Sequence, residues 1–259
     1  EVLDELSIYI SEESKNKKTI KQALTYPIMI MFVMVIINII VINFVLPTFV
    51  SIFQSYGKEL PLITQILLKI AEFFKSYGFF IFLFLVLSSI CILVLRKDKN
   101  IRLKLDKFTY LHLPFFKYRR LSLEYQLTSL LYILKAGDID IVTSLDIIKE
   151  SFKNTYIKGV LSQIIYDLEK GYKLSISLAS KEIFSPLLIS MVKIGEDTGQ
   201  MTETLKKSSE YFATDYIYKL KYIAGLAEPL MIIIMSVVVG FVVFAIALPI
   251  FESVNGVGF

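Results

Sequence analysis

Three long, uncharged apolar runs constrain the fold of this chain more than any other feature. They cover residues 28–46, 79–95 and 230–248 and contain 19, 17 and 19 residues. A hydrocarbon core about 30 Å thick needs roughly 17–25 helical residues to cross it, so each run is long enough for a membrane span. Buried helices of soluble proteins seldom run this long without a charge. The runs therefore predict an all-α membrane protein with three transmembrane helices.

The charges that flank these runs predict the orientation of the spans. Lysines and arginines gather before the first run and after the second, whereas the loop between these two runs holds three lysines and two glutamates. The positive-inside rule then places the N-terminus inside and the C-terminus outside. A basic cluster at 96–120 resembles a nucleic-acid patch, but topology setting and contact with anionic lipids explain it more simply beside a span.

These assignments divide the chain into eight expected segments. They are a cytoplasmic helix (1–26), a first span (27–47), an extracytoplasmic loop with an amphipathic helix (48–77), a second span (78–95), a basic cytoplasmic linker (96–118), a cytoplasmic helical-bundle domain (119–227), a third span (228–249) and an extracytoplasmic tail (250–259).

The first and third spans share a pattern that indicates an internal duplication. Pro27 and Pro229 are 202 residues apart, and so are Pro47 and Pro249. Identical residues recur at this offset over about fifty positions without a gap, as expected for a repeat. The shared unit is an amphipathic helix that runs into a span. Because the first copy begins at residue 1, we expect the body of a first cytoplasmic domain upstream, and thus a truncated first repeat.

Helical periodicity predicts a bundle over 119–227. The apolar positions of 119–137 and 156–171 recur every three to four residues, and each segment stops at a glycine. A helix after Ile141 is expected to have Thr143 or Ser144 as its N-cap. A further helix should begin at the Ser185–Pro186 pair, the preferred N-cap and first-turn residues. A short helix is expected over LSISLAS (174–180), between the 156–171 helix and the helix that begins at Ser185. The last helix of the bundle should start near 199.

The sequence lacks the residue patterns that enzymes need. It contains no nucleophile elbow, zinc-protease, Walker or dinucleotide motif, and it has one histidine, His112, and one cysteine, Cys91. A metal site normally needs three or four converging donors. The spans contain no ionisable residue at mid-depth, and we interpret their polar side chains as helix–helix contacts rather than a transport path. Those side chains belong to Asn38, Asn43, Ser88, Ser89 and Ser236.

The stretch MVKIGEDTGQM at 191–201 interrupts the bundle helices with two acidic residues between two glycines. Gly195 suits a helix C-cap with a positive φ. Asp197, with Gln200 three residues on, suits a capping box at the start of the next helix. Two carboxylates are few for a calcium cage, so a metal loop is the weaker alternative. The stretch is predicted to be a joint between two helices.

This stretch and the two proline-bounded spans resemble the type II secretion system protein F family. The G-E-x-T-G turn of that family is matched at Gly195, Glu196, Thr198 and Gly199. Its Y-P and E-P pairs at the starts of the spans are matched at 26–27 and 228–229, and its "VLP-F" end at 45–49. The matching residues outside the turn are Tyr26, Pro27, Pro47, Glu228, Pro229 and Pro249.

The resemblance implies a non-enzymatic platform protein in the bacterial inner membrane, without a cofactor. Members of the family form six-helix cytoplasmic bundles and oligomerise beneath a type IV pilus, a type II secretion pseudopilus or a competence pseudopilus. They contact a hexameric cytoplasmic ATPase and pilin or pseudopilin subunits. A membrane transporter or receptor built on a duplicated bundle is the alternative function, and direct nucleic-acid binding is not expected.

Overall fold

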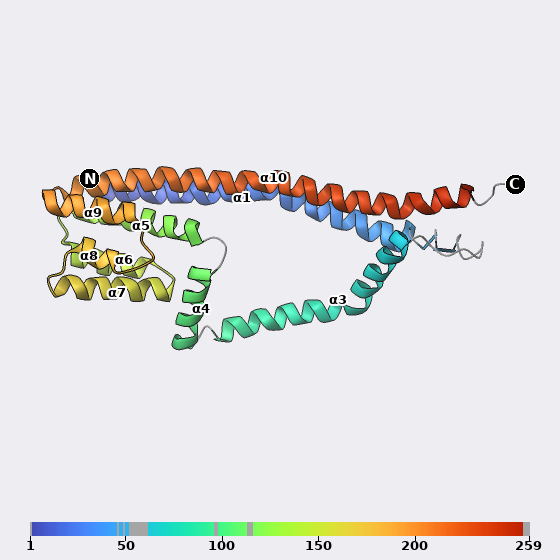
Figure 1. Ribbon diagram of the computed structural model, residues 1–259, viewed down its shortest axis with the longest axis horizontal. Helices are drawn as coiled ribbons and strands as arrows, with labels where there is room; N and C mark the ends of the chain where they lie inside the picture. Colours follow the sequence, from blue (N-terminus) through green and yellow to red (C-terminus); the bar gives the residue numbers. More distant parts are fainter. Residues whose placement is uncertain are drawn as a thin grey trace. The chain divides into compact units, whose positions relative to one another are not determined.

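The computed structural model describes residues 2–45, 47–48, 50–51, 62–95, 98–112 and 116–255. Within these ranges every regular element is a helix, which confirms the all-α prediction (Figure 1). Parts of the expected loop (52–61), linker (96–97 and 113–115) and tail (256–259) lie outside the described residues. The helices are α1 (Val2–Ile40), η1 (Val41–Val45), α3 (Leu62–Leu95), α4 (Lys99–His112), α5 (Phe116–Ala136), α6 (Ile141–Ser151), α7 (Thr155–Glu169), α8 (Leu174–Ala179), α9 (Pro186–Thr198) and α10 (Met201–Asn255).

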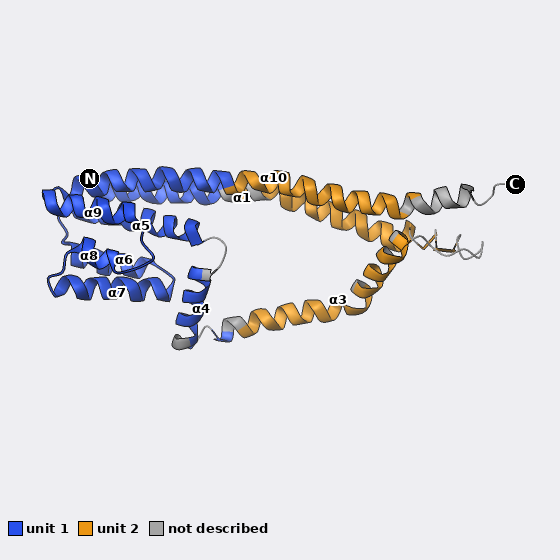
Figure 2. Cartoon of the chain, viewed as in Figure 1, with its two compact units in different colours: residues 1–19, 92–222 blue, residues 20–91, 223–259 orange. Residues whose placement is uncertain are grey.

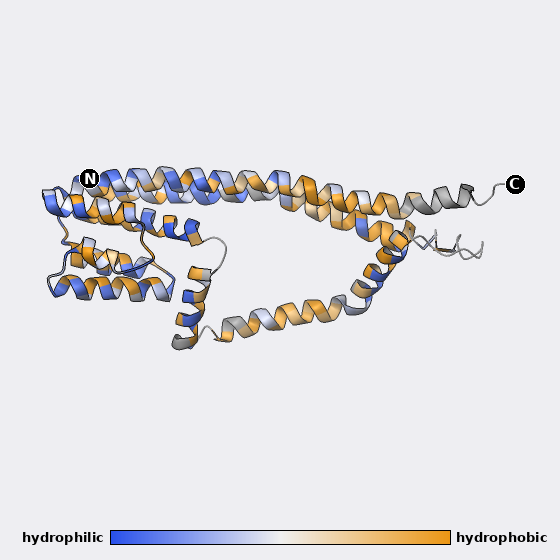
Figure 3. Ribbon diagram, in the orientation of Figure 1, coloured by the Kyte–Doolittle hydropathy of each residue, from blue (hydrophilic) through white to orange (hydrophobic). Residues whose placement is uncertain are grey.

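The chain divides into two compact units (Figure 2). Unit 1 contains residues 1–19 and 92–222, and unit 2 contains residues 20–91 and 223–259. Two long helices, α1 and α10, each contribute a polar part to unit 1 and an apolar part to unit 2, as the change of colour along them shows (Figure 3). The predicted continuity of an amphipathic helix with a span is therefore present in both.

Unit 1 is a helical bundle with one hydrophobic core. Its centre is formed by side chains of α5, α6, α7, α8, α9 and the first part of α10. The predicted periodic positions are confirmed, because in α5 and α7 one face of each helix is buried. These buried residues are Leu121, Leu123, Leu127 and Leu131 in α5, and Ile157, Val160, Leu161 and Ile164 in α7.

Short polar side chains begin several helices of unit 1. The Ser185 hydroxyl accepts a hydrogen bond from the Leu188 amide, and Pro186 follows it as predicted. The predicted N-cap of α6 was wrong, since the side chain of Asp140, not that of Thr143 or Ser144, accepts from the Thr143 amide at 3.0 Å. This hydrogen bond lowers the pKa of Asp140 below its usual value.

Unit 2 contains the helices that can cross a membrane. Two helices of the described residues are long and apolar enough, at Thr25–Val45 and within Met201–Ala245. The second predicted span lies in α3, where Thr64–Phe73 and Lys75–Cys91 meet at a bend of 47° and together form a broken span or a re-entrant loop. The Thr64 hydroxyl donates to the Ala245 carbonyl at 2.8 Å, which ties α3 to α10 within this unit.

Polar groups in the first span are satisfied within their own helix. The amide groups of Asn38 and Asn43 donate to the carbonyls of Met34 and Ile39 at 2.9 and 2.8 Å. Their predicted place in helix–helix contacts stays a prediction. In lipid, a donor is best satisfied where a partner is always present, and a carbonyl one turn away in the same helix meets this condition.

Candidate functional site

The GEDTG turn, residues 195–199, forms the last turn of α9 and its C-cap, just before the start of α10 in unit 1. The predicted helix end at Gly195 was wrong, because α9 continues for one more turn to Thr198. The left-handed residue is Gly199, with φ 72°, and it forms the C-cap of α9. Glycine suits this position because it has no Cβ to clash in the left-handed region. The break between the two helices is therefore only two residues long.

Gly195 has a packing role rather than a conformational one. It is buried in the last turn of α9, where this helix meets the start of α10. A Cβ atom at this position would lie 3.1 Å from the Met201 sulfur and 3.2 Å from both the Met201 Cα and the Thr204 Cβ. These distances are shorter than ordinary van der Waals contact, so the missing side chain lets α9 and α10 approach closely.

The Glu196 side chain caps another helix. Its carboxylate accepts hydrogen bonds from the Leu174 amide at 2.6 Å, from the Ser175 amide at 3.2 Å and from the Ser175 hydroxyl. The N-cap residue of α8, Lys173, makes no side-chain cap of its own. Glu196 thus satisfies two of the amides that every helix start leaves unpaired, and its negative charge lies at the positive end of the helix dipole.

The remaining residues of the turn act locally. Asp197 is part of α9 and pairs with Lys173 at 2.7 Å, so the predicted capping box with Gln200 was wrong. This pair is exposed, and the hydrogen bond from Lys173 lowers the pKa of Asp197. The Thr198 hydroxyl donates to the Ile194 carbonyl at 2.7 Å and accepts from the Gln200 amide at 3.4 Å. These bonds close the last turn of α9.

A second carboxylate at a helix start was missed by the sequence analysis. Glu124 lies in the middle of α5 and is only 2% exposed. It accepts a hydrogen bond from the Ser185 amide at the N-cap of α9. Burial raises the pKa of Glu124 above its usual value, although the hydrogen bonds from Ser185 act in the opposite direction.

The two glutamates connect three helices in series. Glu124 ties α5 to the start of α9, and Glu196 ties the end of α9 to the start of α8. A third carboxylate, outside this series, also bonds to the start of a helix. Asp106 of α4 accepts a hydrogen bond of 2.8 Å from the amide of Thr155, the first residue of α7. The arrangement holds helix ends together and leaves these carboxylates engaged with backbone donors.

The other predicted motif residues belong to unit 2. Tyr26 is exposed and Pro27 is buried, and both lie within α1 rather than at its end. Glu228 and Pro229 are exposed in the interior of α10. Pro47 is exposed on a short helical stretch, and Pro249 lies inside α10, which runs six residues further. Pro27, Pro229 and Pro249 therefore mark the spans in the sequence without ending the helices.

The described residues of the GEDTG turn are engaged in structural contacts. No group of three or more metal-ligating side chains is found there. Each of the two turn carboxylates is bonded to a partner within unit 1, Glu196 to the start of α8 and Asp197 to Lys173. The GEDTG turn can fix the angle and spacing of α8, α9 and α10, which is a mechanical task.

The pKa of Glu124 leads to a prediction about stability. Because the folded state holds the Glu124 proton more tightly than the unfolded state, the glutamate lowers stability increasingly as the pH rises above about 4.5, its ordinary value. In Glu124→Gln this contribution is absent. The melting temperature of the full chain in detergent, relative to that of Glu124→Gln, should fall as the pH is raised from 4.5 to 7. Exposed Glu169→Gln is the matched control and should run parallel to the unmodified chain; a parallel course for Glu124→Gln would contradict the prediction.

Comparisons with known proteins agree with this architecture. A family model described as type II secretion system (T2SS), protein F matches residues 1–47 and 127–249. The type IV pilus assembly protein PilC of Pseudomonas aeruginosa is 30% identical over 99% of this chain and 69% of its own length. The PilC protein of Thermus thermophilus is 26% identical, with 98% of this chain and 63% of the relative covered.

A protein named for type II secretion is similar as well. The type II secretion system protein F of Pseudomonas aeruginosa is 28% identical over 99% of this chain and 64% of its own length. The chain thus spans about two thirds of the length of these relatives. It belongs to the type II secretion system protein F family, the non-enzymatic platform proteins of type IV pilus and type II secretion machines.

Proposed function

We propose that this chain couples a cytoplasmic assembly ATPase to the extraction and polymerisation of pilin or pseudopilin subunits in the inner membrane. The observation that carries this proposal is the continuity of α10, a single helix from Met201 to Asn255. Its first part belongs to the bundle of unit 1, and its later part contains the apolar run 230–248. A continuous helix, whose backbone hydrogen bonds run along its axis, transmits a displacement better than a flexible linker does.

The GEDTG turn supplies the bundle end of this coupling helix. Close packing at Gly195 and the cap from Glu196 fix α10 to α9 and α9 to α8. A force applied to the surface of the bundle therefore reaches the start of α10 through stiff contacts. Nucleotide hydrolysis belongs to the ATPase in this proposal, and the chain itself forms a homo-oligomeric platform.

The proposed topology follows the distribution of charge. We place residues 1–26 and 96–227 in the cytoplasm, the 48–77 segment and the C-terminus outside, and spans at 27–47, 78–95 and 228–249. The duplication at offset 202 is part of this proposal. It is supported by the recurrence of Pro27 and Pro47 at 229 and 249, and by the shared passage from polar to apolar helix in α1 and α10.

A proline in the coupling helix tests the proposal. Gly225 is exposed, and its Cβ position has no neighbour within 4 Å, so Gly225→Pro acts on the backbone alone. Proline removes one ladder bond and clashes with the carbonyl four residues earlier. Pro229 already lacks the next such bond, so two consecutive turns would be weakened. We expect surface pili, or DNA uptake in a competence system, to fall about tenfold or more, with the protein still present in the membrane.

Gly225→Ala is the matched control and should retain assembly, because alanine favours the helix. Normal assembly by Gly225→Pro at normal protein level would rule out mechanical coupling through α10. Substrate flux through the purified protein in liposomes, in the absence of an ATPase and pilins, would instead support the transporter function.

A further inference from the structure

Helix α4 has two chemically different faces. The inner face is anchored in unit 1, where Asp106 bonds to the start of α7 and Tyr110 is 3% exposed with its ring near Phe116 and Tyr156. Arg102 reinforces this contact by donating to the Lys153 carbonyl at 3.2 Å. The outer face carries exposed lysines together with an exposed aromatic ring.

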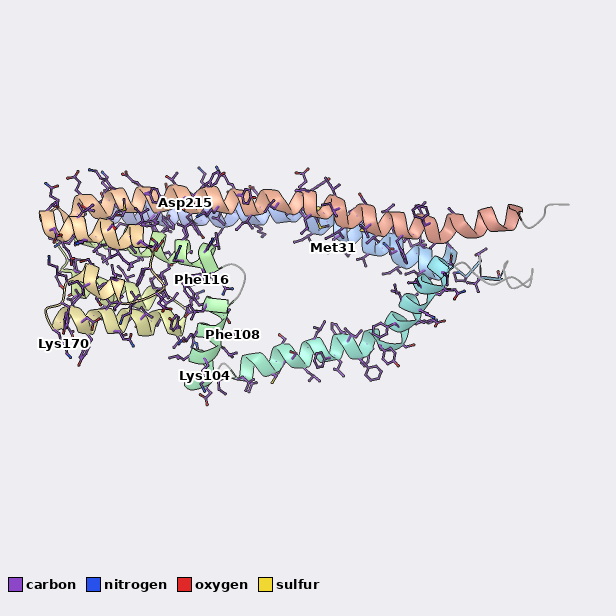
Figure 4. All side chains as sticks on the ribbon, in the orientation of Figure 1. Met31, Lys104, Phe108, Phe116, Lys170 and Asp215 are labelled. Carbon is purple, nitrogen blue, oxygen red and sulfur yellow. The ribbon has the colours of Figure 1, made fainter. Side chains whose placement is uncertain are left out.

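The outer face combines positive charge with apolar area. Lys104 is exposed and Phe108 keeps 60% of its surface accessible (Figure 4). Lys107 is exposed at the edge of this face, beside α7, where its ammonium group lies 5.8 Å from the centre of the Tyr156 ring. The four-residue spacing of 104 and 108 places these two side chains one turn apart on the same side of the helix. The only carboxylate within α4 is Asp106, which is 8% exposed and faces the bundle. The outer face is therefore positive without an acidic residue of its own helix.

The chain keeps this helix close to the end of a membrane span. Helix α3, which contains the apolar run 79–95, ends at Leu95, and α4 starts at Lys99. Four residue steps extend to about 14 Å at most, so the start of α4 remains near the level where the apolar run ends. Within unit 1, α4 runs across α7 rather than along it (Figure 4). Helices that lie in a bilayer interface combine these features: basic and aromatic residues together on an exposed face beside the membrane.

We infer that α4 lies on the membrane surface and binds anionic phospholipids, with Lys104 and Lys107 at the headgroups and Phe108 at the boundary of the acyl chains. Charge complementarity selects this occupant, because an apolar ring one turn from a lysine, with a second lysine at the edge of the same face, suits a negatively charged lipid surface better than an apolar protein partner. The inference does not depend on coupling to an ATPase. It gives unit 1 a second attachment to the membrane beside its covalent connections.

Tryptophan fluorescence can test this directly, since the chain contains no tryptophan. Phe108→Trp places a single reporter on the outer face, and Tyr172→Trp places a matched one on a loop side chain that is 58% exposed. The full chain is reconstituted in vesicles that contain brominated phosphatidylglycerol or brominated phosphatidylcholine. We expect bromine quenching of Phe108→Trp to exceed that of Tyr172→Trp at least about twofold in the anionic vesicles.

Removing the charges tests the choice of lipid. In the Phe108→Trp background, Lys104→Gln with Lys107→Gln should reduce the quenching by about half, and so should high salt, which screens the attraction. Lys170→Gln with Lys193→Gln, two exposed lysines elsewhere in unit 1, should have no effect. Circular dichroism checks that each variant is folded. Equal quenching at positions 108 and 172 would overturn the inference. So would equal quenching in both lipids, or a blue-shifted emission without quenching, which would indicate a protein partner or a second copy.

Discussion

Replacing Glu196 with alanine is expected to destabilise the start of α8 by about 2 kcal/mol, one of the two largest effects that we predict. The carboxylate accepts from the amides of Leu174 and Ser175 and from the Ser175 hydroxyl, and α8 has only six residues. A helix this short is not stable by itself and depends on its tertiary contacts. Loss of the cap leaves two amides without a partner in a partly buried place.

Hydrogen exchange of the full chain in detergent measures this effect. A loss of about 2 kcal/mol corresponds to roughly 30-fold faster exchange of the α8 amides in Glu196→Ala. Asp197→Ala is the matched control, because Asp197 is the next residue and its ion pair with Lys173 is exposed. It should leave α8 exchange unchanged. If the two variants exchange alike, the capping role assigned to Glu196 is wrong.

Among the motif residues, the sequence identified the positions better than their roles. Glu196 and the two glycines of the GEDTG turn were recognised, but the helix end was placed at the wrong glycine. Both glycines fit a helix C-cap by residue type, and the choice depends on whether α10 packs against position 195 or 199. That contact joins residues near 195 to Met201 and Thr204, and it depends on the path of the chain rather than on composition.

The core of unit 1 could be predicted because apolar residues that recur with helical period lie on one face of a helix, and that face is the one buried. The stripe of leucines in α5 predicted the buried face, and Glu124 lies within the same stripe. A carboxylate in an apolar stripe gives no sign of its partner, and the amide that it binds belongs to Ser185, 61 residues later in the chain. Helix α4 was missed for a related reason, since its many charges indicated a linker although its structure depends on packing against α7.

The prolines at the starts of the first and third predicted spans lie inside helices. Helices α1 and α10 pass through Pro27 and Pro229, as the predicted continuity of an amphipathic helix with a span requires. In a soluble helix an internal proline costs about 3 kcal/mol. In membrane helices, neighbouring helices and local adjustments of the backbone satisfy the freed carbonyls, so the same residue is tolerated.

Gly195→Leu is expected to destabilise unit 1 by about 2 kcal/mol or more, whereas the same substitution at Gly159 should stabilise it by about 1 kcal/mol. Both glycines lie inside helices, Gly159 in α7 and Gly195 in α9. Leucine is the better helix former at either position. The two sites differ in their surroundings, because a Cβ at Gly159 meets no atom within 4 Å, and a Cβ at Gly195 meets Met201 and Thr204 at 3.1–3.2 Å.

Thermal unfolding of the full chain in detergent, followed by circular dichroism, measures both changes. With a shift of about 2–4 °C for each kcal/mol, Gly195→Leu should melt at least about 4 °C lower and Gly159→Leu about 2 °C higher. The opposite signs separate close packing from helix propensity, since propensity alone would raise both melting temperatures. The backbone of Met201 cannot rotate away from an added side chain as its flexible sulfur end can, so α10 itself must shift. An unchanged or higher melting temperature for Gly195→Leu would show that α9 and α10 are not held in close contact at the GEDTG turn.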